Sequence, residues 1–359
     1  MITKYKISHS KFLYIFFIFL SLIIFFFSTD KTEAKSFEIN NIDISTPFEI
    51  NFDKNKVIDD GFKKAFFRLM TLTVNSSDQI KTKNIKMNEI KAMIESFSIK
   101  EEKFIDEIYY VKMGVSFNRK KIFTYLEKNN IFPSIPIKKK LLFIPVLIEQ
   151  NNNKLLIYEN NRIFDDWNNH IKDSHLIEYV LPTEDLEDME LIKKNFEYIE
   201  NYDFKKIIDK YYLKDSIVAL IFKKNKDLRI LSRITIKDEV ILKNQTFENV
   251  ELDNQEQTKY LIENLKIIYE DYWKSSNQIN TSIKLLLNIK IKNNDNNKIL
   301  DFEELLNNTD SVNDYYIVKF DKNFTYYQII FNGTSDIFLK DMKEQNYNFD
   351  TQNIIWILQ

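Results

Sequence analysis

Glycine is almost absent from this chain of 359 residues, which contains only Gly61, Gly114 and Gly333. Loops that hold a phosphate against backbone N–H groups need closely spaced glycines, because side chains would keep the phosphate at a distance. The chain therefore has neither a Walker A loop nor a dinucleotide-binding fingerprint. The Gly-x-Ser-x-Gly turn that presents the nucleophile of many hydrolases is missing as well. Enzymes built on these motifs are excluded.

Length and composition indicate a globular protein with two or three cores. Hydrophobic residues make up 44% of the chain and aromatic residues 14%, which is enough apolar surface for several domains. The formal net charge is only -2, so no overall field attracts nucleic acid, and no nucleic-acid partner is expected. There is no cysteine, so disulfides and thiolate metal sites are excluded.

The first 34 residues have the pattern of an export signal. Lys4, Lys6 and Lys11 precede an uninterrupted apolar stretch at 12–27, and a polar segment then ends at Ala34 with small residues typical of a cleavage site. Two outcomes stay open: the segment is cleaved, or residues 12–27 remain as an anchor in the inner membrane. In both cases the rest of the chain is predicted to be exported to the periplasm, and the membrane is contacted only through an uncleaved N-terminal segment.

Alternating strand and helix patterns predict an α+β fold with multi-module mixed sheets and packed helices. The stretch at 141–149, LLFIPVLIE, is apolar throughout and indicates a central strand covered on both faces. Residues 253–273 carry an apolar stripe at helical spacing and predict a long core helix. A helix is also expected from Met87 to Phe97. The last eighty residues follow the order β-α-β-β-α-β and predict a C-terminal ferredoxin-like unit.

Breaks in these patterns divide the chain. Pro133 and Pro136 interrupt the helical pattern and mark the first boundary, and a polar stretch at 274–282 acts as a linker. The expected division is a signal peptide or anchor at 1–34, an N-terminal α+β module at 35–137, a central α/β module at 138–252, a helix and linker at 253–279, and the ferredoxin-like module at 280–359.

The segment 180–192, VLPTEDLEDMELI, is the best place to look for chemistry, because it holds Glu184, Asp185, Glu187, Asp188 and Glu190. We interpret it as a helix start. Thr183 is the expected cap, the acids oppose the positive end of the helix dipole, and Leu186, Met189 and Ile192 form the expected buried side. Glu184 and Asp188, four positions apart on one helix face, could hold a divalent cation, but no third ligand is evident. A protein-binding surface is the other alternative.

Two histidines remain beyond the export signal, His170 and His175. On a helix, five positions correspond to a rotation of about 140°, so these side chains would not face one metal ion. We expect both to be exposed loop residues. The sequence therefore assigns no catalytic, cofactor-binding or metal-binding residue and implies no cofactor.

Several segments resemble a family of exported proteobacterial proteins that is catalogued as a domain of unknown function. The similar segments are FEINNIDIS, GFKKAFFRLM, VKMGVSFNRKKIFTYLEKNNI, KLLFIPVLIE, DDWNNH and YVLPTEDLEDM, which lie within residues 37–190. This chain departs from the family by having Lys, Asn and Ile at positions of Ala and Gly. The resemblance implies a periplasmic or membrane-anchored protein. It supplies no active-site residues.

Three functional hypotheses follow. The first is a non-enzymatic cell-envelope protein that binds another envelope protein, based on the export signal and the lack of any catalytic motif. The second is a carboxylate- or metal-dependent hydrolase that uses the acids at 184–190 with His170 or His175. The third is an anchored ligand-sensing module, by analogy with other ferredoxin-like units. A partner-binding protein should expose an apolar patch, whereas an enzyme needs polar groups that converge in a pocket.

Overall fold

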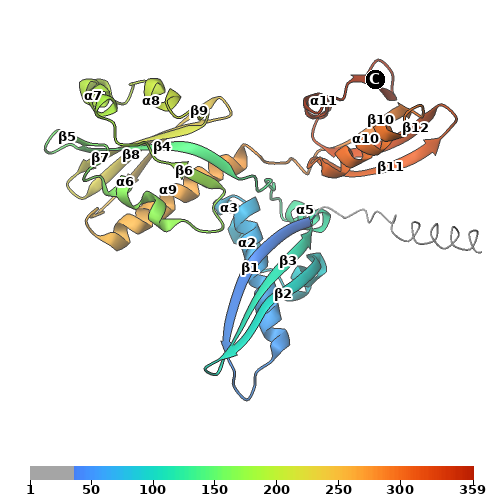
Figure 1. Cartoon of the computed structure of the whole chain (residues 1–359), viewed down its shortest axis with the longest axis horizontal. Coiled ribbons are helices and arrows are strands. Elements are labelled where there is room, and N and C mark those ends of the chain that lie inside the picture. The colour runs from blue at the N-terminus through green and yellow to red at the C-terminus, as the bar shows by residue number, and fades with distance from the viewer. Residues whose placement is uncertain (1–35) are drawn as a thin grey trace, which may run out of the picture.

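A computed structural model describes residues 36–359 and confirms the α+β fold, with three separate β-sheets and helices packed on them (Figure 1). The predicted export segment at 1–34 lies outside the described residues. Among residues 36–359, no helix is both long enough and apolar enough to cross a membrane.

The N-terminal sheet is antiparallel, with the strand order β1-β3-β2. It consists of β1 (Ser36–Pro47), β2 (Ile94–Ile105) and β3 (Ile108–Asn118). One face is covered by α2 (Lys54–Thr73), and shorter helices complete the unit: α3 (Ser76–Gln79), α4 (Met87–Met93) and α5 (Arg119–Lys128).

The predicted helix from Met87 to Phe97 was wrong in its second half. The helix α4 ends at Met93, and β2 begins at Ile94 and pairs with β3. Almost all of β2 is exposed on both faces, so its sequence lacks the alternation that identifies a strand. Phe97 nevertheless contacts the core, because its ring lies edge-on to Phe62 at 5.0 Å.

The central sheet is mixed and has the order β5-β4-β7-β8-β9, with β6 paired to the start of β4. Its two central strands, β4 and β7, are parallel neighbours. The strands are β4 (Lys139–Glu149), β5 (Lys154–Leu156), β6 (Ile177–Val180), β7 (Ser216–Lys224), β8 (Asp227–Ile236) and β9 (Glu239–Phe247). The stretch predicted as a central strand, 141–149, lies within β4, whereas β9, whose residues are mostly exposed, was not predicted.

Different helices cover the two faces of the central sheet (Figure 1). On one face lie α6 (Arg162–Asp166) and the long α9 (Gln255–Ser275), which pack against Phe143 and Leu147. On the other lie α7 (Leu186–Lys194) and α8 (Lys205–Asp209), which pack against Ile144. The interior of β4 is therefore buried on both faces, as its apolar run predicted.

The C-terminal unit follows the predicted order β-α-β-β-α-β but adds a further strand, so it departs from the regular ferredoxin-like unit that was predicted. It runs β10 (Lys284–Lys292), α10 (Asn296–Asn308), β11 (Val312–Phe320), β12 (Phe324–Asn332), α11 (Ser335–Glu344), β13 (Phe349–Asp350) and β14 (Trp356–Leu358). The sheet order is β11-β12-β10-β14-β13, so the strand beside β10 on the side away from β12 is the added β14, which is parallel to it. The strand β13 runs parallel to β12, as expected after a helical crossover. The chain then turns back, and β14 lies between β13 and β10, parallel to β10.

The C-terminal end of α9 joins the central sheet to the N-terminal unit. The Lys274 ammonium is buried and donates hydrogen bonds to the carbonyl oxygens of Thr71 and Val74, at 3.1 and 3.0 Å. These carbonyls lie at the C-terminus of α2, where a cation is favoured by the helix dipole. One turn earlier on α9, Asp271 accepts a hydrogen bond of 2.9 Å from the Ser76 N–H.

Candidate functional site

The acidic segment does begin a helix, but its cap is Asp185 and not the predicted Thr183. The Asp185 carboxylate accepts hydrogen bonds from the N–H groups of Glu187 and Asp188, at 2.8 and 3.4 Å. Thr183 lies two residues before this cap, and its N–H donates to the hydroxyl of Tyr211 at 2.8 Å. Glu184 precedes the helix, so the proposed pair of Glu184 and Asp188 on one helix face does not form.

The buried side of α7 also differs from the prediction. Leu186 is 73% exposed, Met189 is partly buried, and only Ile192 is fully buried as expected. Asp188, in contrast, is only 1% exposed. A carboxylate is costly to bury without a partner, so the sequence pattern placed it on the surface.

Lys210 is the partner that makes this burial tolerable. Its ammonium lies 2.6 Å from Asp188 Oδ1 and 2.8 Å from Asp185 Oδ2. These two hydrogen bonds raise the pKa of Lys210, and the bond to Lys210 is the main reason that the pKa of Asp185 is lowered. Lys210 directly follows α8, so its ion pairs with Asp185 and Asp188 connect the end of α8 to the start of α7.

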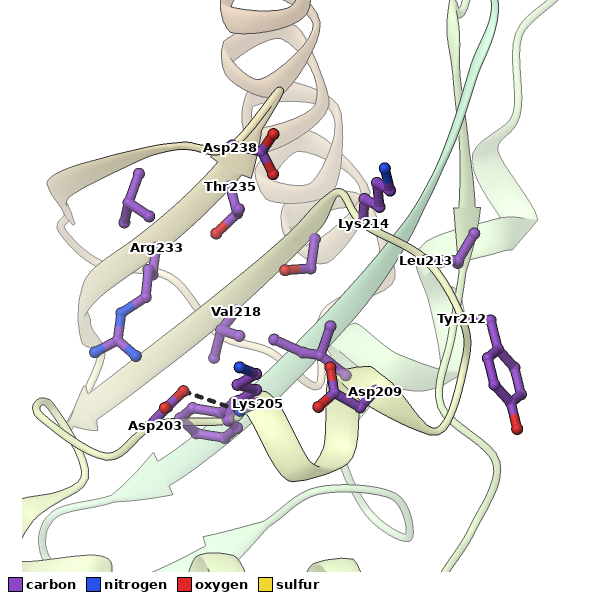
Figure 2. A pocket seen from close by; sticks show the side chains of 14 residues that line it. Asp203, Lys205, Asp209, Tyr212, Leu213, Lys214, Val218, Arg233, Thr235 and Asp238 are labelled. Carbon is purple, nitrogen blue, oxygen red and sulfur yellow. Dashed lines mark hydrogen bonds between the residues drawn. The ribbon is translucent and has the colours of Figure 1, made fainter.

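The helix α8 forms one wall of a groove of about 720 Å³ on this face of the central sheet (Figure 2). Side chains of β7 and β8, including Val218, Arg233 and Thr235, form its floor. The loop after α8 and the turn between β8 and β9 complete the rim. Fourteen residues line the groove: Asp203, Phe204, Lys205, Ile208, Asp209, Tyr212, Leu213, Lys214, Ser216, Val218, Arg233, Thr235, Asp238 and Val240.

Charged side chains of both signs surround the groove, and Arg233 among them is held in place by backbone carbonyl groups. The Arg233 guanidinium donates hydrogen bonds to the carbonyl oxygens of Tyr202 and Glu200, at 2.8 and 3.0 Å. Asp203 accepts from the N–H of Lys205 at 3.0 Å, the contact drawn in Figure 2. The fourteen lining residues include neither His nor Cys. The groove therefore offers apolar surface with a mixed polar rim.

The edge strand β9 borders the groove. It pairs with β8 from Leu228↔Phe247 to Ile236↔Glu239 without a register shift, and no strand among residues 36–359 pairs with its other edge. Val240 lies opposite Thr235 and Leu242 opposite Arg233, so both side chains share the groove face. They are 60% and 64% exposed. An unbulged edge strand with exposed apolar side chains can accept another strand.

The structure does not bring the histidines together with the acids of 184–190. His170 lies in a short 3-10 turn at 167–170, and His175 lies just before β6, near Lys266 of α9. His175 is half-buried, so the prediction that it is an exposed loop residue was wrong. Burial, followed by the charges of Lys266 and Lys172, lowers its pKa to about 4. Its Nδ1 accepts a hydrogen bond from the Lys172 N–H at 3.3 Å.

Sequence reasoning missed the groove because its walls come from distant segments. A signal for the edge strand was present in the apolar residues Val240 and Leu242, which follow the turn residues Lys237 and Asp238 with φ values of 52° and 66°.

Within residues 36–359, no three His, Cys, Asp or Glu side chains are grouped as a metal site requires. No family model and no curated protein matches the chain, so the resemblance to an exported family stays a prediction.

Proposed function

We propose that this chain is an exported, non-enzymatic cell-envelope protein that binds another envelope protein through the groove and the open edge of β9. The observation that carries the proposal is that β9 has both an edge without a partner strand among residues 36–359 and exposed apolar side chains at Val240 and Leu242. Isolated exposed apolar residues are common on proteins, but here two neighbours on one strand face adjoin a groove.

The proposed ligand is an extended segment of the partner. Its backbone would add a strand beside β9, where N–H and C=O groups supply affinity, and its alternate side chains would enter the groove. A volume of about 720 Å³ is large enough for several side chains. The apolar side chains of Val240, on the groove, and Leu242, beside it, would contact apolar side chains of the partner.

The charge pattern indicates what kind of segment fits. Lys205 and Lys214 lie on the rim with Asp209 and Asp238, so the two signs are balanced there. Such a rim gives no strong field of either sign, and rim charges affect association rate more than affinity. We therefore expect binding to depend on apolar contacts and backbone pairing and to change little with salt.

In-cell photocrosslinking tests the proposal. A photoreactive amino acid replaces Leu242, which lies beside the groove on β9, and a matched copy carries it at Tyr260, an exposed position on α9 at the opposite face of the sheet. The adducts are separated and identified by mass spectrometry. We expect a discrete adduct from position 242 and a much weaker one from position 260.

Two results would overturn the proposal. Adducts of the same identity and yield from both positions would mean that capture reflects crowding and not a specific groove. The absence of any adduct at 242, in cells where the protein is correctly exported and folded, would also overturn the proposal.

A further inference from the structure

A second hollow, of about 570 Å³, lies on the α9 face of the central sheet, where β4 and β6 begin. We call it the lysine cleft. It is lined by the three successive lysines at 138–140, by Lys172, His175 and Tyr179, and by Lys266, which projects from the middle of α9. None of these residues belongs to the groove beside β9.

Lys266 is an unusual lysine because it is only 1% exposed. Its ammonium donates a hydrogen bond to the Trp167 carbonyl oxygen at 2.6 Å and lies 5.4 Å from the centre of the Trp167 ring. It also lies 5.7 Å from the centre of the Tyr179 ring. Burial lowers the pKa of Lys266 to about 8, against the opposing effect of Glu270 and Glu263. Aromatic faces and a carbonyl thus stabilise a charge that is shielded from bulk water.

Two polar groups beside this ammonium are buried without a hydrogen-bond partner among the described residues. They are the Tyr179 hydroxyl and the Trp167 indole N–H. Buried donors are nearly always satisfied in folded proteins, because leaving one unpaired costs about 1–3 kcal/mol. Both groups are donors, so the missing partner should be an acceptor.

The lining of the cleft is rich in lysine, and most of these lysines are paired with carboxylates. The lining contains five lysines, against the two carboxylates of Asp173 and Glu178. Three of these lysines have carboxylate partners, in the pairs Lys139–Asp215, Lys140–Glu178 and Lys172–Glu263. Lys138 forms no salt bridge within residues 36–359.

The buried carboxylate of Glu270 acts on Lys266 and raises its pKa, which partly offsets the effect of burial. Glu270 accepts hydrogen bonds from the N–H groups of Leu176 and Ile177, at 2.8–3.0 Å, and these bonds hold the chain entering β6. His175 is uncharged at neutral pH, because its pKa is about 4. Asp173 is engaged by Arg68 of α2 at 3.0 Å.

We propose that the lysine cleft binds a small organic anion whose carboxylate or phosphate group accepts hydrogen bonds from Lys266 and Tyr179. An oxyanion supplies several acceptor oxygens and a negative charge, which match a buried ammonium and a buried hydroxyl donor. The cleft volume lies in the usual range for small-molecule sites and exceeds what a bare inorganic ion would fill.

Equilibrium dialysis of the full-length protein with labelled inorganic phosphate and with labelled citrate tests this assignment at constant ionic strength. We expect saturable binding of at least one of the two anions. Lys266→Met should weaken it by about tenfold or more, which corresponds to about 1.4 kcal/mol. Tyr179→Phe, which keeps the ring and removes only the hydroxyl, should weaken it severalfold. Lys259→Met removes the same charge from an exposed position of α9 and should leave binding unchanged.

Any of three results would overturn the assignment: no saturable binding of either anion, equal binding by the Lys266→Met and Lys259→Met proteins, or wild-type affinity in Tyr179→Phe. Circular dichroism establishes whether each variant is folded. If Lys266→Met does not fold, Tyr179→Phe alone decides, because its hydroxyl has no partner in the described structure that folding would lose.

Discussion

The two faces of the central sheet use the same strands but are covered in different ways. On one face, α9 extends for 21 residues and buries Leu261, Leu265 and Tyr269 against β4 and β8. On the other face, α7 and α8 have nine and five residues, and α8 leaves the groove open along the sheet edge. The two faces are formed by the same strands, so the length of the covering helices accounts for the difference in how much of each face stays open.

Ionisable groups differ between the two faces for the same reason. Under α9, burial dominates and raises the pKa of Glu270 while it lowers that of Lys266. On the α8 face, hydrogen bonds to carboxylates dominate and raise the pKa of Lys210. Charges on the covered face are therefore shifted toward their neutral forms, whereas those on the open face are stabilised as ions.

Two leucine-to-alanine substitutions, one on each face of the central sheet, test whether the two faces differ in their contribution to stability. Leu265→Ala, on the covered face, should lower the free energy of unfolding by about 2–5 kcal/mol, because it leaves a cavity in a packed core. Leu242→Ala, on the open face, should change it by no more than about 0.5 kcal/mol. Urea unfolding followed by circular dichroism measures both. Similar losses in the two variants would show that the open face is part of the stabilising core.

The cap of α7 gives a smaller and sharper test on the open face. Asp185→Ala removes the cap and one partner of Lys210, so the melting temperature should fall by about 2–4 °C. Thr183→Ala should change it far less, because the Thr183 hydroxyl does not cap the helix. Differential scanning calorimetry compares the two variants. A larger loss for Thr183→Ala would restore Thr183 as the cap.

A third test is a pH dependence on the covered face. The pKa of His175 falls from about 6.5 in the unfolded chain to about 4 in the folded protein, so the unfolded state binds the proton more readily in this range. The stability that the buried, neutral imidazole of His175 contributes at pH 7 should therefore be lost as the pH falls from about 6.5 to about 4. The difference in melting temperature between wild type and His175→Gln, measured across this window, isolates the contribution. A difference that is independent of pH would contradict the burial of this imidazole.

Sequence patterns predicted the elements that have a buried face, because burial creates a regular apolar pattern within the element. The apolar run of β4 and the stripe of α9 were both evident, because each signal lies within one element. The order of elements after residue 280 was predicted only in part, because the short strands β13 and β14 were expected as one strand. The strands β2 and β9 were missed. Both are exposed edge strands, and an edge strand lacks the buried side that creates a strand pattern.

The contacts between α7 and α8 were less accessible to sequence reasoning. Asp185 and Thr183 are both good capping residues, and local sequence gave no reason to choose the later one. The burial of Asp188 depends on Lys210, which is 22 residues away along the chain. Such pairings are tertiary, so they appear only when α7 and α8 are placed side by side.

The affinity of the partner captured at position 242 for the purified full-length protein tests the central claim most directly. Isothermal titration calorimetry would compare wild type with Leu242→Asp and with Tyr260→Asp, two exposed positions on opposite faces of the sheet. We predict that Leu242→Asp weakens binding by about tenfold or more, since a charge there would face the apolar contact, while Tyr260→Asp leaves the affinity within about twofold. Equal affinities for the two variants would contradict the assignment of the groove beside β9 as the binding surface.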